Sequence, residues 1–303
     1  MRYGFLLAAL ALASPSLAQG GMPGQLTFDP SAPQPGAVLA VEYTPGSILP
    51  DDGALDLRAR LRTPDRAWPD RSTVTRAVAV LEAGSDGVYR GRFALPDSVA
   101  FALFAVSTVS GDAVDTNLEA GWPLLTYGPD GLPTVAAYSE RVDDLGRRDF
   151  RTGARVARAF TEDHPARVEA WSSLSFYESV APTGALDSLA LSSRIAQLDQ
   201  QLSREATPDL EDAYALTWLA GLGTDVSTRW ASWLIENAPA FPGSVRHRVY
   251  RVLDERGQEP TADRLAALDA IYLDVGAVDD ALMDVGLGTA IEAGDHGAAI
   301  AWA

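Results

Sequence analysis

The sequence predicts an antiparallel β-sandwich followed by an α-helical repeat array. Ahead of Trp122 the apolar residues mostly alternate with polar ones, which is the period of a strand. Behind Pro133 they recur every three or four positions, which is the period of a helix. Residues 111–133 between them carry the densest turn signals of the chain. We therefore expect a β domain over residues 19–131 and an α domain over residues 132–303.

Residues 1–18 have the pattern of a secretory signal peptide. Arg2 supplies a short positive region, residues 4–13 are apolar, and Ser16-Leu17-Ala18 is a small-x-small cleavage signal before Gln19. The apolar run is too short to cross a bilayer. We therefore expect an exported protein, periplasmic or extracellular, that does not insert into a membrane after the signal is removed.

The chain is strongly acidic and has no cysteine. Its 24 cationic residues are all arginine, and 41 acidic residues bring the formal charge to −17. Such a surface repels nucleic acid and anionic lipid, so we expect neither as a partner. The missing cysteine excludes disulfides and thiol chemistry within these residues. Codon bias and adaptation to high salt are alternative explanations of the acidity, and they are compatible with each other.

The β half shows about seven strands separated by turn signals, which is the pattern of a sandwich. The expected strands cover residues 26–28, 38–44, 55–63, 73–82, 88–95, 99–109 and 122–127. Gly84-Ser85-Asp86-Gly87 predicts a hairpin between the fourth and fifth of these. Arg58, Arg60 and Arg62 alternate with apolar residues in the third. We interpret this arginine row as a solvated face paired with acids, and a strip that binds an anionic ligand is the alternative.

The α half shows ten helical patterns. The expected helices cover residues 134–145, 149–162, 165–180, 186–204, 208–222, 226–237, 244–255, 262–274 and 278–293, with a last one from about residue 295. Residues 162–165 and 236–239 each end one helix and precede another, and they lie about 74 residues apart. This distance suits two helix pairs of about 37 residues, the size of a tetratricopeptide-like (TPR-like) unit.

Large aromatic residues recur through the helical half. They are Trp171, Phe176, Trp218, Trp230, Trp233 and Tyr250. Because each helix pair buries its apolar face only against a neighbour, we expect these side chains to fill the seams between pairs. The alternative is an aromatic groove that binds peptide.

The sequence contains no pattern for catalysis. There is no GxSxG motif, and a GxxxxGK[ST] motif is impossible without lysine. His164, His247 and His296 are far apart and outside any HExxH pattern, so we interpret them as surface or cap residues. The adjacent pairs Asp51-Asp52, Asp143-Asp144 and Asp279-Asp280 do not form acid–base couples, because neighbours on a helix do not share a face. We expect no catalytic residue and no cofactor.

The junction offers the best set of oxygen ligands for a metal. Asp112, Asp115, Asn117 and Glu119 supply alternating oxygens of the kind that bind Ca²⁺. Their spacing differs from that of a helix-loop-helix calcium site. We therefore assign no metal site and keep calcium as an alternative.

Two stretches resemble a known family. The first is Leu26-Thr27-Phe28-Asp29-Pro30 with Pro33, Pro35-Gly36 and Val41-Glu42-Tyr43, and the second is Val114-Asp115-Thr116-Asn117, Gly121-Trp122 and Tyr127-Gly128-Pro129-Asp130-Gly131-Leu132-Pro133. They resemble the start and the end of the N-terminal Ig-like domain of exported bacterial thioredoxin-like proteins. The resemblance implies an Ig-like domain, a TPR-like helical region and then a thioredoxin domain with a CxxC redox pair. Since this chain has no CxxC, no catalytic residue carries over.

These observations lead us to expect a non-catalytic exported region that binds protein or peptide. The first alternative is the front part of a periplasmic thiol-disulfide oxidoreductase whose redox domain lies beyond residue 303. The apolar last helix favours a longer gene product, since helical arrays usually finish on a polar cap. The second alternative is a carbohydrate-binding sandwich with an aromatic platform near Trp68.

Overall fold

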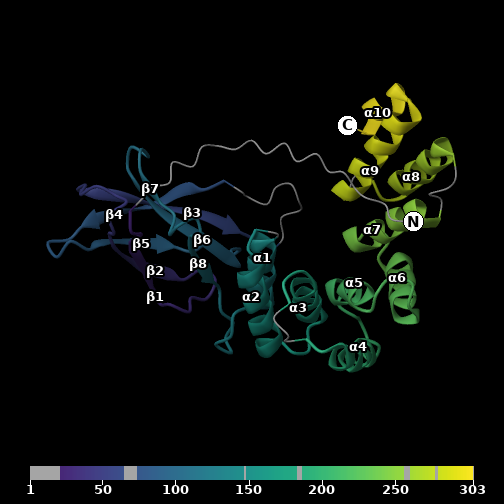
Figure 1. Cartoon of the computed structure of the whole chain (residues 1–303), viewed down its shortest axis with the longest axis horizontal. Coiled ribbons are helices and arrows are strands. Elements are labelled where there is room, and N and C mark those ends of the chain that lie inside the picture. Colours follow the sequence, from purple (N-terminus) through teal and green to yellow (C-terminus); the bar gives the residue numbers. More distant parts are fainter. Residues whose placement is uncertain are drawn as a thin grey trace. The chain divides into compact units, whose positions relative to one another are not determined.

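The chain consists of a β region followed by helices, as the sequence predicts (Figure 1). The computed structural model describes residues 21–64, 74–146, 148–182, 186–255, 260–276 and 279–302. The expected signal peptide and Trp68 lie outside these residues. Two compact units result: the first comprises 21–60, Val74–Leu95 and Ala102–Leu124, and the second comprises 61–64, Pro96–Phe101 and 125–302.

The first unit contains most of an eight-stranded antiparallel sheet. Its strands are β1 (Gln25–Asp29), β2 (Val38–Thr44), β3 (Ala54–Arg62), β4 (Arg76–Ala83), β5 (Tyr89–Ala94), β6 (Phe101–Thr108), β7 (Val114–Asp115) and β8 (Trp122–Leu125). The strand order is β1-β2-β5-β4-β3-β6-β7, with β8 also paired to β6. The predicted β4–β5 hairpin is confirmed, and β6 is almost completely buried. The two-residue strand β7 is an addition to the predicted set.

The sheet curves, because strands far apart in its order meet in one core. The Phe28 ring of β1 and the Phe104 ring of β6 lie 4.7 Å apart, and Phe93 of β5 contacts the same Phe104 ring at 5.9 Å. Alternate residues of β2 and β3, such as Val41 and Leu57, are fully buried on this side. In each of these strands one face is buried and the other is exposed or partly exposed to solvent, which is the alternation of apolar and polar residues that predicted the strands.

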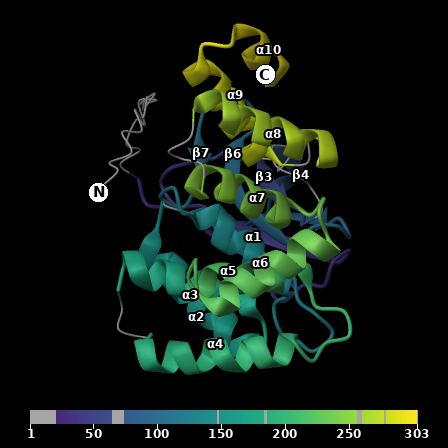
Figure 2. The same cartoon turned by 90° about the vertical axis from the view of Figure 1, so that its right-hand side faces the viewer.

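The second unit is helical and follows the ten predicted segments closely. The helices are α1 (Val135–Leu145), α2 (Phe150–Asp163), α3 (Val168–Val180), α4 (Ser188–Leu202), α5 (Leu210–Leu219), α6 (Asp225–Asn237), α7 (Pro242–Glu255), α8 (Thr261–Val275), α9 (Asp280–Ala293) and α10 (His296–Trp302). Figure 2 shows them following one another through this unit. Within the described residues, none of these helices combines the length and the apolar character needed to span a bilayer.

Most consecutive helices contact each other, and the odd-numbered helices also contact one another. The pairs α1–α2, α5–α6 and α9–α10 are in close contact, and α3 packs directly against α5. From the end of α2 to the end of α6 the chain passes through four helices, α3 to α6. Side chains at the expected positions begin several helices: Thr134 caps α1 and Asp209 caps α5.

Candidate binding site

The predicted aromatic residues of the helical half range from buried to exposed, and Trp171 and Trp233 are partly buried against a core of the second unit. Trp230 is 4% exposed and packs in a core with Leu216 and Leu234, as seam filling requires. Phe176, Trp218 and Tyr250 instead expose 42%, 41% and 37% of their surface. The prediction of core packing is therefore wrong for these three side chains, which leave aromatic surface open on α3, α5 and α7.

Trp218 is the centre of an aromatic cluster between α5 and α7. Its indole stacks on the His247 ring, with 5.8 Å between centroids and 17° between planes. Tyr214 and Tyr250 meet the indole edge-on at 6.2 and 6.3 Å. The cluster holds the indole in one orientation while leaving part of it exposed.

His247 is buried beneath this cluster, so its interpretation as a surface or cap residue is wrong. It is 3% exposed, and its Nε2 atom lies 2.7 Å from the Thr217 hydroxyl oxygen. Burial lowers the pKa of His247, because the charged imidazolium loses hydration. The ring therefore acts as a packing surface for Trp218 that is neutral near pH 7.

Helices α3 and α5 carry the same two-residue pattern. Glu169 precedes Phe176 by seven positions, and Glu211 precedes Trp218 by the same interval. Seven residues are close to two helical turns, so each glutamate shares a face with its aromatic partner, about 10 Å away along the axis. In the helical half of the sequence the Glu-x6-aromatic pattern occurs at these two places, and helical periodicity alone does not single it out.

Acidic groups converge where α1, α3 and α5 meet. The pKa of Glu169 is raised to about 7, mainly by burial and in smaller part by the nearby charges of Glu211 and Asp212. A hydrogen bond with Ser139 and the charge of Arg167 act in the opposite direction. The Glu169 carboxyl group is thus partly protonated near neutral pH and responds to any added charge.

Asp212 fixes this acidic end structurally. Its Oδ1 accepts hydrogen bonds from the N–H groups of Val168 and Glu169, at 3.0 and 3.3 Å, and so caps the start of α3. The Arg167 Nε atom lies 3.3 Å from its other carboxylate oxygen. Asp212 is therefore occupied with positioning α3 against α5.

We call the resulting surface the odd-helix face. It consists of Glu169 and Phe176 from α3, Glu211, Tyr214 and Trp218 from α5, and Tyr250 from α7. Carboxylates lie at one end of α3 and α5, and aromatic rings lie two turns further along. Such a face can contact a ligand that is cationic at one point and apolar at another.

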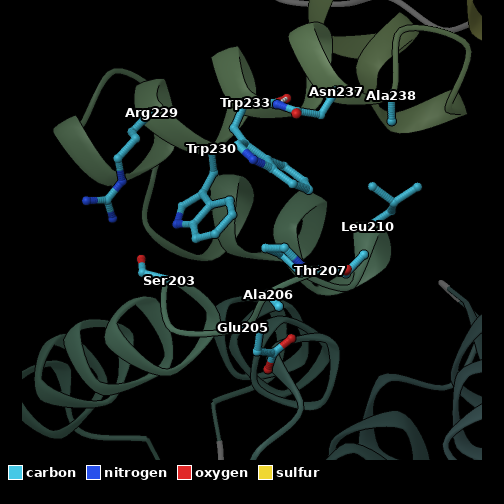
Figure 3. A pocket seen from close by; sticks show the side chains of 11 residues that line it. Ser203, Glu205, Ala206, Thr207, Leu210, Arg229, Trp230, Trp233, Asn237 and Ala238 are labelled. Carbon is cyan, nitrogen blue, oxygen red and sulfur yellow. Dashed lines mark hydrogen bonds between the residues drawn. The ribbon is translucent and has the colours of Figure 1, made fainter.

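A cavity of about 690 Å³ opens beside α6 (Figure 3). Trp230 and Trp233 extend from α6 toward the connection between α4 and α5. The lining residues are Ser203, Glu205, Ala206, Thr207, Pro208, Leu210, Arg229, Trp230, Trp233, Asn237 and Ala238. We call it the Trp233 cavity.

Of the four junction residues considered as calcium ligands, Asp115 and Asn117 form hydrogen bonds within the first unit, whereas Asp112 and Glu119 are exposed. Asp115 is fully buried, and its Oδ2 accepts hydrogen bonds from the Gly24 N–H at 2.6 Å and the Tyr43 hydroxyl at 2.7 Å. Burial and this bond raise the pKa of Tyr43. The Asp115 Oδ1 accepts the Asn117 N–H at 2.9 Å. Over the described ranges, no three His, Cys, Asp or Glu side chains come together in a way that suits a metal ion.

The arginine row of β3 is not uniformly solvated. Arg62 is 7% exposed, and inside the second unit its Nε lies 2.8 Å from the Glu140 carboxylate of α1, with Asp143 in contact as well. For Arg62 the interpretation is wrong about solvation, because this end of the strand is covered, whereas the expected pairing with acids is confirmed.

The other two histidines, His164 and His296, lie at helix ends. His164 ends α2, and its Nε2 lies 2.7 Å from the Pro133 carbonyl oxygen. His296 is exposed at the start of α10. The structure does not bring the three histidines together.

Comparison of the chain with protein-family models, with curated proteins and with solved structures gives no match.

Proposed function

We propose that the helical unit binds polypeptide segments, and that the odd-helix face is the contact surface. The observation that carries the proposal is the exposure of Phe176, Trp218 and Tyr250 on successive odd-numbered helices. Large aromatic side chains that remain open on a stable scaffold are common anchors of protein contacts. The stacking of Trp218 on His247 supports a preformed surface, which lowers the ordering cost of binding.

The partner we propose is a segment with arginine or lysine a short distance from an apolar side chain. A cationic group would lie near Glu169 and Glu211, and the apolar group would contact Trp218. The two sites are about 10 Å apart along the helix, a distance that about three residues of an extended peptide cover. The net charge of −17 attracts such a segment and repels acidic ones.

Binding of this kind is coupled to the protonation of Glu169. A ligand cation stabilises the charged carboxylate and lowers the Glu169 pKa from its value of about 7. Binding then releases a proton, so affinity rises as the pH increases from about 6 to about 8. The sign would reverse for an anionic ligand.

The test is fluorescence anisotropy with a labelled peptide of repeated Arg-Ser-Ser-Leu units. Trp218→Ala is expected to weaken binding at least about tenfold, because the apolar anchor loses its partner. Glu169→Gln is expected to remove the rise of affinity with pH. Leu189→Ala, which alters a side chain that is 78% exposed on α4, serves as the matched surface control.

Two results would contradict the proposal. One is equal binding of a Glu-Ser-Ser-Leu peptide, which would show that the acidic end does not select charge. The other is unchanged binding by Trp218→Ala with a normal far-ultraviolet spectrum, which would indicate diffuse attraction to an acidic protein.

We further propose the finer architecture of the two units and their export. The odd-numbered helices begin at residues 135, 168, 210, 242 and 280, intervals that support a TPR-like array. The curved antiparallel sheet with its enclosed aromatic core supports an Ig-like domain. Export is supported by the signal pattern of residues 1–18.

A further inference from the structure

The Trp233 cavity combines an indole wall with a polar rim. Trp230 forms the fixed part of the wall: it is buried, and its Nε1 donates a hydrogen bond to the Asp199 carboxylate at 2.8 Å. Trp233 packs edge-on against it, with 5.5 Å between ring centroids and 72° between ring planes. The Trp233 ring is only partly buried and borders the open space.

The polar groups of the cavity lie around this wall. Asn237 donates its side-chain N–H to the Trp233 carbonyl at 2.8 Å, which orients the amide and leaves its oxygen as an acceptor. Ser203 and Thr207 contribute hydroxyl groups, and Glu205 contributes a carboxylate. The cavity thus has both donors and acceptors, set around an apolar aromatic surface (Figure 3).

The charges argue for a neutral ligand. Arg229 is the cation of the cavity, and it is in contact with Asp199 and lies 5.8 Å from the centre of the Trp230 ring. Its charge is therefore balanced by Asp199, and its guanidinium lies beside the buried Trp230 ring. Glu205 and the net charge of −17 oppose an anion.

We propose that the Trp233 cavity binds a neutral sugar ring. A pyranose has one face of C–H groups, which packs on an indole, and a rim of hydroxyl groups that donate and accept hydrogen bonds. The volume of about 690 Å³ is in the range of small-molecule sites. A fully apolar ligand would leave the amide and hydroxyl groups of the rim without partners when their water is displaced. This site is separate from the odd-helix face and does not depend on the function proposed for that face.

The test is isothermal titration of the whole protein with maltose, cellobiose, lactose and diacetylchitobiose, each a neutral disaccharide. At least one is expected to bind, with saturation-transfer NMR showing contact through the ring protons. Trp233→Ala is expected to weaken that binding at least about tenfold. Trp233→Phe keeps an aromatic face and is expected to retain most of the affinity, which separates stacking from folding.

Trp218→Ala is the matched control, since it removes an indole of the same unit outside the cavity. It should leave sugar binding unchanged while weakening the arginine peptide, and Trp233→Ala should do the opposite. The proposal is overturned if none of the four disaccharides binds the wild-type protein. It is also overturned if binding survives Trp233→Ala, or if a hydrophobic dye fills the cavity without competition from any sugar.

Discussion

Glu169 shows how the packing of three helices sets the charge of one residue. Its pKa of about 7 results mainly from burial, with repulsion from Glu211 and Asp212 adding to it. The unfolded chain has an ordinary glutamate pKa of 4.5. Between these two values the native protein binds a proton that the unfolded chain has lost, so the stability from this group falls as pH rises through the window.

The first prediction concerns Glu169→Gln, which replaces the carboxyl group with an amide that is neutral at every pH. At pH 8 we expect the variant to exceed the wild type in unfolding free energy by about 1–3 kcal/mol, because the wild-type carboxylate is then charged and partly buried. At pH 4, below the unfolded pKa of 4.5, the difference should nearly vanish. Urea unfolding followed by circular dichroism at both pH values measures it, with the exposed Glu236→Gln as control. An equal difference at both pH values would refute the assignment.

Single residues also show where sequence reasoning stops. The type and spacing of Asp115 suggested an oxygen ligand, but the donors that occupy it come from Gly24 and Tyr43, far away in the sequence. His247 gave no signal of burial, because its position depends on how α5 meets α7. Contacts between distant segments decide these roles, and one sequence does not display them.

At the scale of elements, glycines mark the places where two helices come closest. A Cβ atom added to Gly153 of α2 would lie 2.1 Å from the Tyr177 ring of α3. That ring is buried, and its hydroxyl donates to the carbonyl groups of Val142 and Gly146 at 2.9 and 3.1 Å. The Tyr177 ring is therefore held in place and cannot easily shift to make room for a Cβ atom at position 153.

The second prediction compares two glycines of helix interiors. Gly153→Ala should destabilise the protein by about 1–3 kcal/mol, since overpacking outweighs the better helix propensity of alanine. Gly288→Ala in α9 has no atom within 4 Å of the added Cβ and should be neutral or stabilise by up to about 1 kcal/mol. Thermal unfolding of both variants measures the contrast. Equal effects would show that the close approach of α2 and α3 is not maintained in solution.

Elements were the most predictable level of this protein. All ten helices lie close to their predicted segments, because turn residues and cap residues such as Thr134 and Asp209 punctuate the helical period. The β4–β5 hairpin was equally visible from its glycine turn. An exposed aromatic surface was considered only as the alternative to core packing, since periodicity identifies an apolar residue but does not say whether a neighbouring helix covers it.

On the scale of the whole molecule, charge connects stability and binding. The formal charge of −17 creates self-repulsion in the compact state. It also attracts cationic segments over distances that salt reduces, since the Debye length falls from about 10 Å at 0.1 M to about 3 Å at 1 M. The binding of a neutral sugar depends on neither this self-repulsion nor this attraction. Salt concentration is therefore one variable that distinguishes three properties: the stability of the fold, the binding of cationic segments and the binding of a neutral sugar.

The third prediction is that sodium chloride moves these properties in different directions. Between about 0.05 and about 0.5 M salt we expect the urea midpoint to rise, because screening relieves the repulsion among the acidic groups. The affinity for the Arg-Ser-Ser-Leu peptide should fall several-fold, since the attraction to Glu169 and Glu211 is screened as well. Disaccharide binding at Trp233 should stay constant. Chemical unfolding, anisotropy and calorimetry at matched salt concentrations provide the three readings. A peptide affinity that does not change with salt concentration would show that aromatic contact alone selects the partner. A sugar affinity that changes with salt concentration would show that charged groups contribute to sugar binding.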